Sequence, residues 1–227
     1  MRRILSKVKR LPSQLHNFYF LARIVCTFRF TLLVSHHIYH TEAFILGGRN
    51  SGEADRMVFA LTPSLGLLHV HARGVRLARS KLRHSLYDFA HADISLVKGR
   101  EIWRVTGARE LSRKESLFAS LEHTALYARI GALIRRLVVG EEADPKLFAE
   151  MKNLHAVLSS GAEIDLVPLE TLLVLRVLGT LGYMNENPFV SDLGIAEELS
   201  VDAVKKVESN HMTALALVNR SLAELHL

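Results

Sequence analysis

Between Tyr39 and Ala108 the chain alternates apolar and polar residues in short runs, and this pattern constrains the fold more than any other feature. A period of two is typical of half-buried β-strands, and Gly, Asn, Ser or Pro residues bound the runs. Five strands are predicted, over residues 39–46, 55–62, 67–75, 89–98 and 101–108. Five short strands favour a small closed barrel, because closure removes the exposed strand edges.

Two of these strands predict which side chains face the barrel interior. The strand over 67–75 is expected to bury Leu68, Val70 and Ala72 and to expose His69, His71 and Arg73. The strand over 89–98 is expected to bury Ala90, Ala92, Ile94 and Leu96 and to expose His91, Asp93 and Ser95. One face of the third strand is therefore wet and basic.

After Ser112 the apolar spacing changes to three or four residues, which indicates helices. Asp144 and Pro145 form an N-cap and first-turn pair. Helices are predicted over 116–139, 145–158, 167–181, 191–199 and 201–225, with 167–181 as the buried central one. The fold class is therefore α+β, with a basic extension over 1–38, a five-stranded barrel over 39–111 and an all-α helical domain over 112–227.

The N-terminal stretch 18–34 is apolar enough to raise the question of a membrane span, but Arg23 and Arg29 interrupt it. Each arginine near a helix centre costs about 2.5–3.5 kcal/mol on insertion scales, so we reject a transmembrane helix and expect no membrane contact. No small-residue cleavage pattern of a signal peptide follows. We expect residues 1–33 to lie outside the functional fold, and Val34 is a candidate alternative start.

The charge is distributed unevenly along a chain whose formal net charge is +6 and whose pI is about 9.6. Residues 1–38 hold seven Lys/Arg and no acid, residues 39–110 hold eleven against seven acids, and residues 111–227 hold eleven against sixteen. A basic front half predicts that a polyanion contacts the first half. The single cysteine, Cys26, excludes an intramolecular disulfide and fits a reducing, cytoplasmic compartment.

The densest cationic stretch is residues 73–83, which we call the basic segment. It has no acid before Asp88, and its cations are Arg73, Arg76, Arg79, Lys81 and Arg83. A polyanion that neutralises such a cluster gains entropy from released counterions. We therefore predict that a polyanion such as nucleic acid binds these five residues together with Arg49 and Arg100. The alternative is a solvated basic loop without a ligand.

Two histidines and three aromatic residues are weaker candidates. His69 and His71 lie two apart on one strand face and could bind a metal, although a wet strand face explains them better. Tyr87, Phe89 and Trp103 could stack on bases, or could fill the barrel and its junction with the helices. For Phe89 we favour the interior.

Motifs of catalysis are missing from the sequence. It has no phosphate-binding loop, no glycine fingerprint after a strand and no HExxH motif. Asp88 and Asp93 are five residues apart on opposite strand faces, a poor acid/base pair. We expect no catalytic activity, no cofactor and no metal.

The segment 40–110 holds an ordered series of residues: Thr41, Glu42, Gly52, Glu53, Asp55, Arg56, Thr62, Gly66, Ala72, Arg73, Gly74, Val75, Arg76, Arg79, Ser80, Lys81, Leu86, Phe89, Gly99, Thr106 and Glu110. On this series the segment resembles the N-terminal half of the RecO family. Further on, Leu175, Arg176, Leu178, Leu181, Gly182 and Tyr183 resemble the helix that ends in the family's Leu-Gly-Tyr turn.

This resemblance implies an OB-fold barrel joined to a helical domain. It also implies binding of single- and double-stranded DNA, annealing of complementary strands, and action with RecR to help RecA replace the single-strand-binding protein. Within the matched motif, Arg56 is expected to pair with Glu53 or Asp55.

The chain departs from the family pattern in two places. Many relatives carry a four-cysteine zinc site after the Leu-Gly-Tyr turn, whereas residues 184–191 contain no cysteine. Some relatives also bind the acidic tail of the single-strand-binding protein through the helical domain. The acidic balance of residues 111–227 weighs against that contact, and Lys205 with Lys206 is the one local basic pair available for it.

We therefore predict a non-catalytic DNA-binding and strand-annealing mediator of recombinational repair. Two alternatives stay open at this point. The first is a protein-interaction module of a repair complex with little DNA binding of its own. The second is a metal-dependent hydrolase built around His69 and His71.

Overall fold

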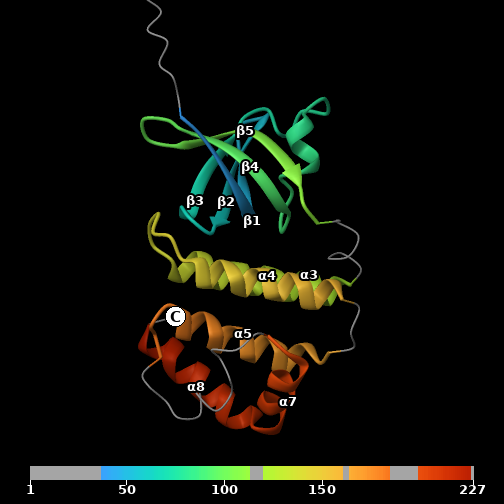
Figure 1. The fold of residues 1–227 in the computed structure, drawn as a ribbon, viewed down its shortest axis with the longest axis vertical. Helices are drawn as coiled ribbons and strands as arrows, with labels where there is room; N and C mark the ends of the chain where they lie inside the picture. Colours follow the sequence, from blue (N-terminus) through green and yellow to red (C-terminus); the bar gives the residue numbers. More distant parts are fainter. Residues whose placement is uncertain (1–36, 113–119, 161–163, 185–198, 226–227) are drawn as a thin grey trace, which may run out of the picture. The chain divides into compact units, whose positions relative to one another are not determined.

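The computed structural model describes residues 37–112, 120–160, 164–184 and 199–225 (Figure 1). The predicted N-terminal extension lies outside the described residues as far as residue 36, and so does the short helix expected over 191–199, apart from its last residue. In the described part no helix is long and apolar enough to cross a membrane.

The first part of the described chain is a closed five-stranded barrel with the strand order β1-β2-β3-β5-β4. Its strands are β1 (Ile38–Ser51), β2 (Asp55–Thr62), β3 (Gly66–Ala72), β4 (His91–Lys98) and β5 (Trp103–Glu110), and a short helix η2 (Lys81–His84) lies between β3 and β4. This is the OB-fold expected from the sequence. The bounds of the second strand are confirmed, whereas β1 continues to Ser51 and β5 begins at Trp103, two residues later than predicted.

The length of β1 explains how only five strands form a closed barrel. Its first half pairs with β4 from Ile38 to Phe44, and its second half pairs with β2 from Phe44 to Ser51. The register shifts between Ile45 and Gly48, which marks an irregularity that bends the strand. A Cβ at Gly48 would lie 2.4 Å from the carbonyl oxygen of Met57, so only glycine fits at this bend.

Both faces of β1 are buried around residues 43–46. Ala43 and Ile45 belong to the barrel interior, while Phe44 and Leu46 belong to a second core shared with the helices. The barrel is therefore attached to the helical domain through a continuous apolar core.

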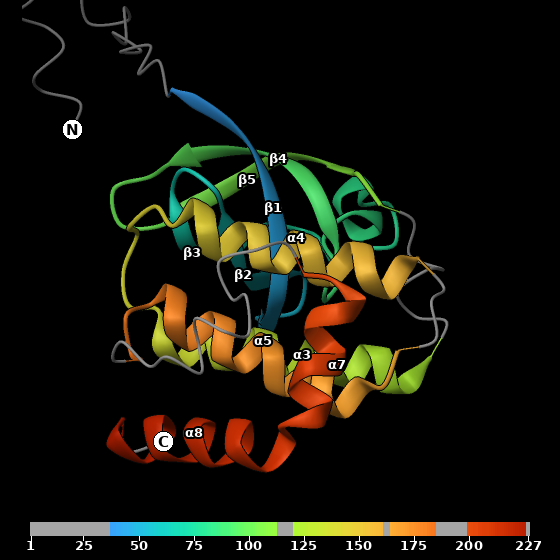
Figure 2. The same cartoon turned by 60° about the horizontal axis from the view of Figure 1, so that its bottom comes forward.

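Five described helices follow the barrel: α3 (Leu121–Leu137), α4 (Pro145–Ser159), α5 (Leu166–Thr180), α7 (Val201–Ser209) and α8 (His211–Glu224). Helices α3 and α4 lie against the barrel, and α5 packs on both of them and on α7 and α8 (Figures 1 and 2). This confirms α5 as the central helix. The predicted N-cap is also confirmed, because a carboxylate oxygen of Asp144 accepts from the backbone N–H of Leu147 at 2.9 Å.

The turn after α5 has the geometry that its Leu-Gly-Tyr sequence favours. Gly182 has a φ of +76°, the backbone N–H of Tyr183 donates to the carbonyl of Leu178, and the N–H of Gly182 donates to that of Gly179. This pair of bonds is the Schellman arrangement that ends a helix at glycine.

The single helix predicted over 201–225 is wrong, because two helices occupy this region. Asn210 separates α7 from α8 with a φ of −120° and a ψ of 24°, and its side-chain amide donates to the carbonyl of Lys206. A short polar side chain that bonds to the backbone competes with helix continuation.

The solvent exposure expected for His91 is also wrong, although its outward direction from the barrel is correct. This side chain is only 6% exposed, stacks on Phe44 at 4.2 Å and contacts a carboxylate oxygen of Glu42 at 2.6 Å. Lys152 of α4 contacts the same Glu42 oxygen at 3.1 Å. Strand alternation places His91 outside the barrel correctly, but the helical domain covers that side.

Candidate nucleic-acid interface

The basic segment is held on the barrel by its own apolar residues. Val75 and Leu86, at either end of the cationic stretch, are buried in the barrel core, and Leu82 packs against the same core. Between them the chain runs through turns and η2 rather than through a regular strand. The side chains of Val75, Leu82 and Leu86 therefore point inward, whereas the cations between them are exposed.

Backbone hydrogen bonds tie the basic segment to the turn between β1 and β2. The backbone N–H of Arg76 donates to the carbonyl of Ala54 at 2.9 Å. A carboxylate oxygen of Asp55 accepts from the backbone N–H of Gly74 at 2.7 Å, and Gly74 has a φ of +64°. The cations are thus carried by a segment that is anchored at several points.

The cationic groups of this segment are exposed and have no carboxylate partner among the described residues. The exposed set is Arg73, Arg76, Arg79, Lys81 and Arg83. Within the part of the chain that the structure describes, the one hydrogen bond from their side chains runs from Arg76 Nη1 to the carbonyl of Gly52, at 3.0 Å. A carbonyl does not neutralise a guanidinium, so the segment keeps its full positive charge.

Three of the nearby acids are engaged elsewhere. Asp55 also contacts His71 at 3.0 Å, Asp88 pairs with Arg56, and Glu110 accepts from the hydroxyl of Tyr87. The expected pairing of Arg56 with Glu53 or Asp55 is corrected by this geometry, because β2 directs Arg56 towards Asp88. These acids therefore do not compensate the basic segment.

An open hollow of about 520 Å³ lies beside the basic segment, between it and the end of the β1–β2 hairpin. Its lining combines cations with polar and apolar groups: Asn50, Arg56, Val75, Arg76, Arg83, Leu86, Tyr87 and Asp88. Arg76 and Arg83, two of the predicted site residues, therefore border the same cavity.

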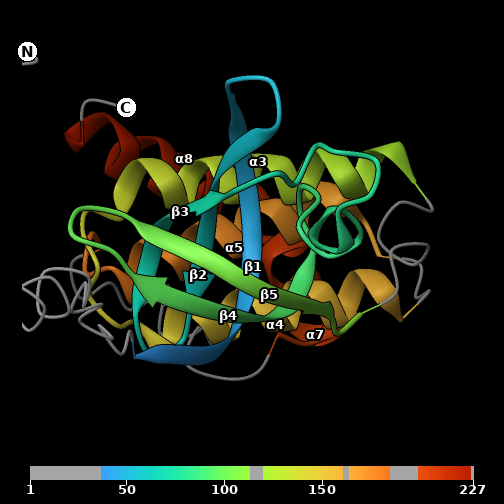
Figure 3. The same ribbon diagram turned by 90° about the horizontal axis from the view of Figure 1, so that it is seen from above.

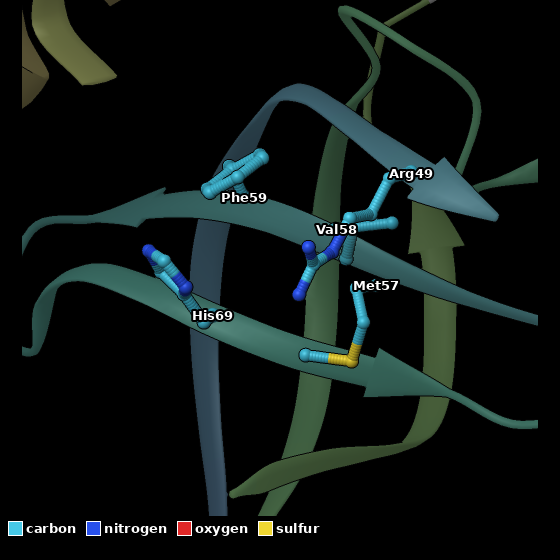
Figure 4. A pocket seen from close by; sticks show the side chains of 5 residues that line it. All are labelled: Arg49, Met57, Val58, Phe59 and His69. Carbon is cyan, nitrogen blue, oxygen red and sulfur yellow. The ribbon is translucent and has the colours of Figure 1, made fainter. Parts of the chain in front are cut away.

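Arg49 lies on a different face of the same hairpin. It pairs in register with Met57, whereas the next pair along the strands joins Asn50 to Arg56. Because side chains alternate across a strand, the two pairs face opposite sides. Arg49 lines a smaller hollow of about 170 Å³ together with Met57, Val58, Phe59 and His69 (Figure 4).

Arg100 is not brought together with the basic segment. It is exposed in the turn between β4 and β5, next to the beginning of β1, where Ile38 pairs with Val97. The basic segment is tied instead to the turn at the far end of β1. Both Figure 1 and Figure 3 show the β4–β5 turn and η2 at opposite ends of the barrel.

Two of the three candidate aromatic residues are built into the fold. Phe89, at a φ of +69°, packs edge-on against Tyr127 of α3, which confirms the favoured interior position. Trp103 is buried, and its indole N–H donates to Glu141 at 2.9 Å. Tyr87 is half-buried beside the larger hollow.

His69 and His71 share a strand face, as predicted, but their rings have different neighbours. His69 packs edge-on against Phe59 at 4.7 Å, and His71 contacts Asp55. Among the described residues, no group of three His, Cys, Asp or Glu side chains is arranged to hold a metal ion. This geometry gives the hydrolase alternative no support.

Two further arginines near these surfaces were not predicted. Arg104 is exposed on β5 and lies in register beside His71. Because Trp103 is buried and side chains alternate along a strand, the alternation could have predicted that Arg104 points outward. Arg135 of α3 lies over the ring of Phe59 at 5.0 Å, and no local pattern links residues so far apart in the sequence.

The described residues thus form a closed five-stranded OB-fold that carries an exposed cationic segment and is followed by helices. Residues 36–112 match the family model described as "Recombination protein O N terminal". This part of the chain therefore carries the N-terminal domain of the RecO family.

Several curated relatives, each named DNA repair protein RecO, align with the chain. The relative from Roseiflexus sp. is 37% identical over 148 residues, which cover 64% of this chain and 50% of the relative. A relative from Dehalococcoides mccartyi is 34% identical over 129 residues, 57% of this chain and 49% of the relative. A relative from Thermobifida fusca is 32% identical over 149 residues, which cover 64% of this chain and 60% of the relative. The chain spans about half the length of the first two of these relatives.

Proposed function

We propose that this chain is a non-catalytic DNA-binding protein of recombinational repair, which binds single- and double-stranded DNA through the basic segment and anneals complementary strands. The observation that carries the proposal is the set of five exposed cations on an anchored segment, without a described carboxylate partner. The name DNA repair protein RecO, which the relatives carry, supports the repair context.

The physical basis is neutralisation of phosphates. Lysine and arginine side chains that contact phosphates release condensed counterions, so binding is strong at low salt and independent of base sequence. Two complementary strands repel each other through the same phosphates. A cationic surface that binds one strand lowers this repulsion when the second strand approaches, and annealing follows from the same charges.

The proposed setting comes from the resemblance to the family. RecR is the proposed protein partner, and the proposed outcome is the loading of RecA on single strands that the single-strand-binding protein covers. We place this activity in the cytoplasm, on the nucleoid. Residues 39–111 form the proposed DNA-binding domain and residues 112–227 the helical domain. The extension expected over 1–38 is proposed for residues 1–36, because Ile38 already belongs to β1.

Fluorescence anisotropy with a labelled single strand at several salt concentrations tests this proposal. If the five cations each contact one phosphate, the slope of log K against log salt is about −3.5, from about −0.7 per contact on single strands. Binding that is absent or insensitive to salt contradicts the proposal and favours the protein-interaction alternative. A strand-annealing assay with the purified chain then tests the second half of the proposal, with faster pairing of complementary strands as the expected result.

A further inference from the structure

The smaller hollow lies on the outer face of β1, β2 and β3, and four side chains converge on it (Figure 4). The guanidinium of Arg49 and the thioether of Met57 extend into it from one side. Phe59 and His69 border the other side. The hollow therefore combines a planar cation, a polarizable sulfur and two flat rings.

The ring of Phe59 is fixed in position from two directions. His69 packs edge-on against it, with ring centroids 4.7 Å apart and an interplanar angle of 83°. Arg135 lies over it at 5.0 Å, and the Nε of Arg135 is buried without a hydrogen-bond partner among the described residues. The far wall of the hollow is thus preorganised, whereas Arg49 is exposed and free to adjust.

We propose that this hollow receives one unpaired nucleobase of a bound single strand, an inference that rests on the proposed DNA binding. Bases stack on aromatic and guanidinium planes regardless of their sequence. The Arg49 guanidinium also donates hydrogen bonds to base carbonyl and ring-nitrogen acceptors. At about 170 Å³ the hollow is smaller than the clefts of roughly 300–1,000 Å³ that bind whole small molecules, so it suits one ring system.

The lining favours a base over a phosphate. Of the five lining residues, Arg49 alone carries a permanent positive charge, and Met57, Val58 and Phe59 are apolar. A phosphate finds more cations in the larger hollow on the opposite face of the hairpin, where Arg76 and Arg83 lie. The smaller hollow therefore suits the base of a nucleotide, and the larger hollow suits its phosphate.

The β1–β2 turn stands between the two sites. Figure 3 shows the hairpin projecting from the barrel with β3 on one side and η2 on the other. Arg76 of the basic segment bonds to Gly52 and Ala54 in that turn. In this proposal, a strand whose backbone is held on the basic segment crosses the turn to place a base in the smaller hollow. Only a strand with an unpaired base can place a base there, so this site favours single strands over duplex.

The test compares two labelled single strands of equal length, oligothymidine and the same backbone carrying abasic tetrahydrofuran units. Both carry the same phosphates, so their affinities differ only through the bases. We expect the full chain to bind oligothymidine about 5- to 150-fold more tightly, the effect of stacking one base. In Arg49→Lys the charge is kept but the planar group is lost, so the ratio falls towards one while the salt slope is unchanged. The matched control Arg79→Lys keeps the ratio.

The possible outcomes distinguish a failure of the base site from a failure of the proposed DNA binding. Equal affinity of the wild-type chain for both strands overturns the base site and leaves phosphate-mediated DNA binding intact. A ratio that survives in both Arg49→Lys and His69→Ala also overturns it, because the bases are then read elsewhere. No binding of either strand overturns both proposals.

Discussion

The basic segment and the interior between α4 and α5 both depend on arginine, but in opposite ways. The segment exposes its arginines without a described carboxylate partner, whereas Arg176 of α5 is 3% exposed and bonds to both carboxylate oxygens of Glu150, at 2.6 and 2.8 Å. A paired, buried arginine contributes to the fold and is closed to a ligand. An unpaired, exposed arginine contributes little to the fold and is open to a polyanion.

The largest expected effect is on the buried pair. Arg176→Leu leaves the Glu150 carboxylate buried without a partner, and we expect the free energy of unfolding to fall by about 3–5 kcal/mol in chemical denaturation. The double variant Glu150→Leu with Arg176→Met removes both charges and should recover most of that loss. An exposed ion pair contributes about 1 kcal/mol or less. A loss of that size in the single variant would contradict the view that Arg176 stabilises the fold in a way that the exposed arginines do not.

The next effect concerns the contact between the barrel and the loop that joins α3 to α4. Gly66 and Gly52 share a φ of +69°, but a Cβ at Gly66 would lie 2.1 Å from the carbonyl oxygen of Glu142, while nothing lies within 4 Å at Gly52. Gly52→Ala should cost about 1–2 kcal/mol of unfolding free energy for the left-handed backbone. Gly66→Ala should cost about 1–3 kcal/mol more from overpacking. Equal losses in thermal or chemical denaturation would show that this loop does not press on the barrel.

A smaller effect depends on pH and comes from His155 of α4. Burial, helped by the nearby His91, lowers the pKa of His155 from 6.5 to about 4. Because the unfolded chain binds this proton more readily, stability is lost as the pH falls from about 6.5 towards 4, by about 2 kcal/mol between pH 7 and pH 5. His155→Leu should remove that part of the pH dependence in denaturation experiments. An unchanged pH profile would mean that His155 has the same pKa in the folded and the unfolded chain.

The strand pattern predicted the barrel because alternation reports which side of a strand is apolar. It could not predict that helices cover the outer side at His91, since that contact joins residues far apart in the chain. The same limit applies to α7 and α8, where apolar spacing continues through Asn210 although the backbone does not.

Local sequence density found the basic segment, because its cations are neighbours in the chain. It also grouped Arg100 with them, although β1 separates the two places. The smaller hollow is assembled from β1, β2 and β3, with Phe59 held in place by Arg135 of α3. No single stretch of sequence holds that combination, so only the folded arrangement reveals it.

The central claim is that the uncompensated charge of the basic segment binds DNA. The direct test is the salt dependence of single-strand binding by a triple charge reversal at Arg76, Arg79 and Lys81, compared with a matched reversal at the exposed Lys146, Lys205 and Lys206 of the helical domain. We expect the first variant to bind all sequences more weakly, with a log–log slope shallower by about 2, from about 0.7 for each lost contact, and the second to bind like the wild type. Equal affinity and equal slope in all three proteins would contradict the account.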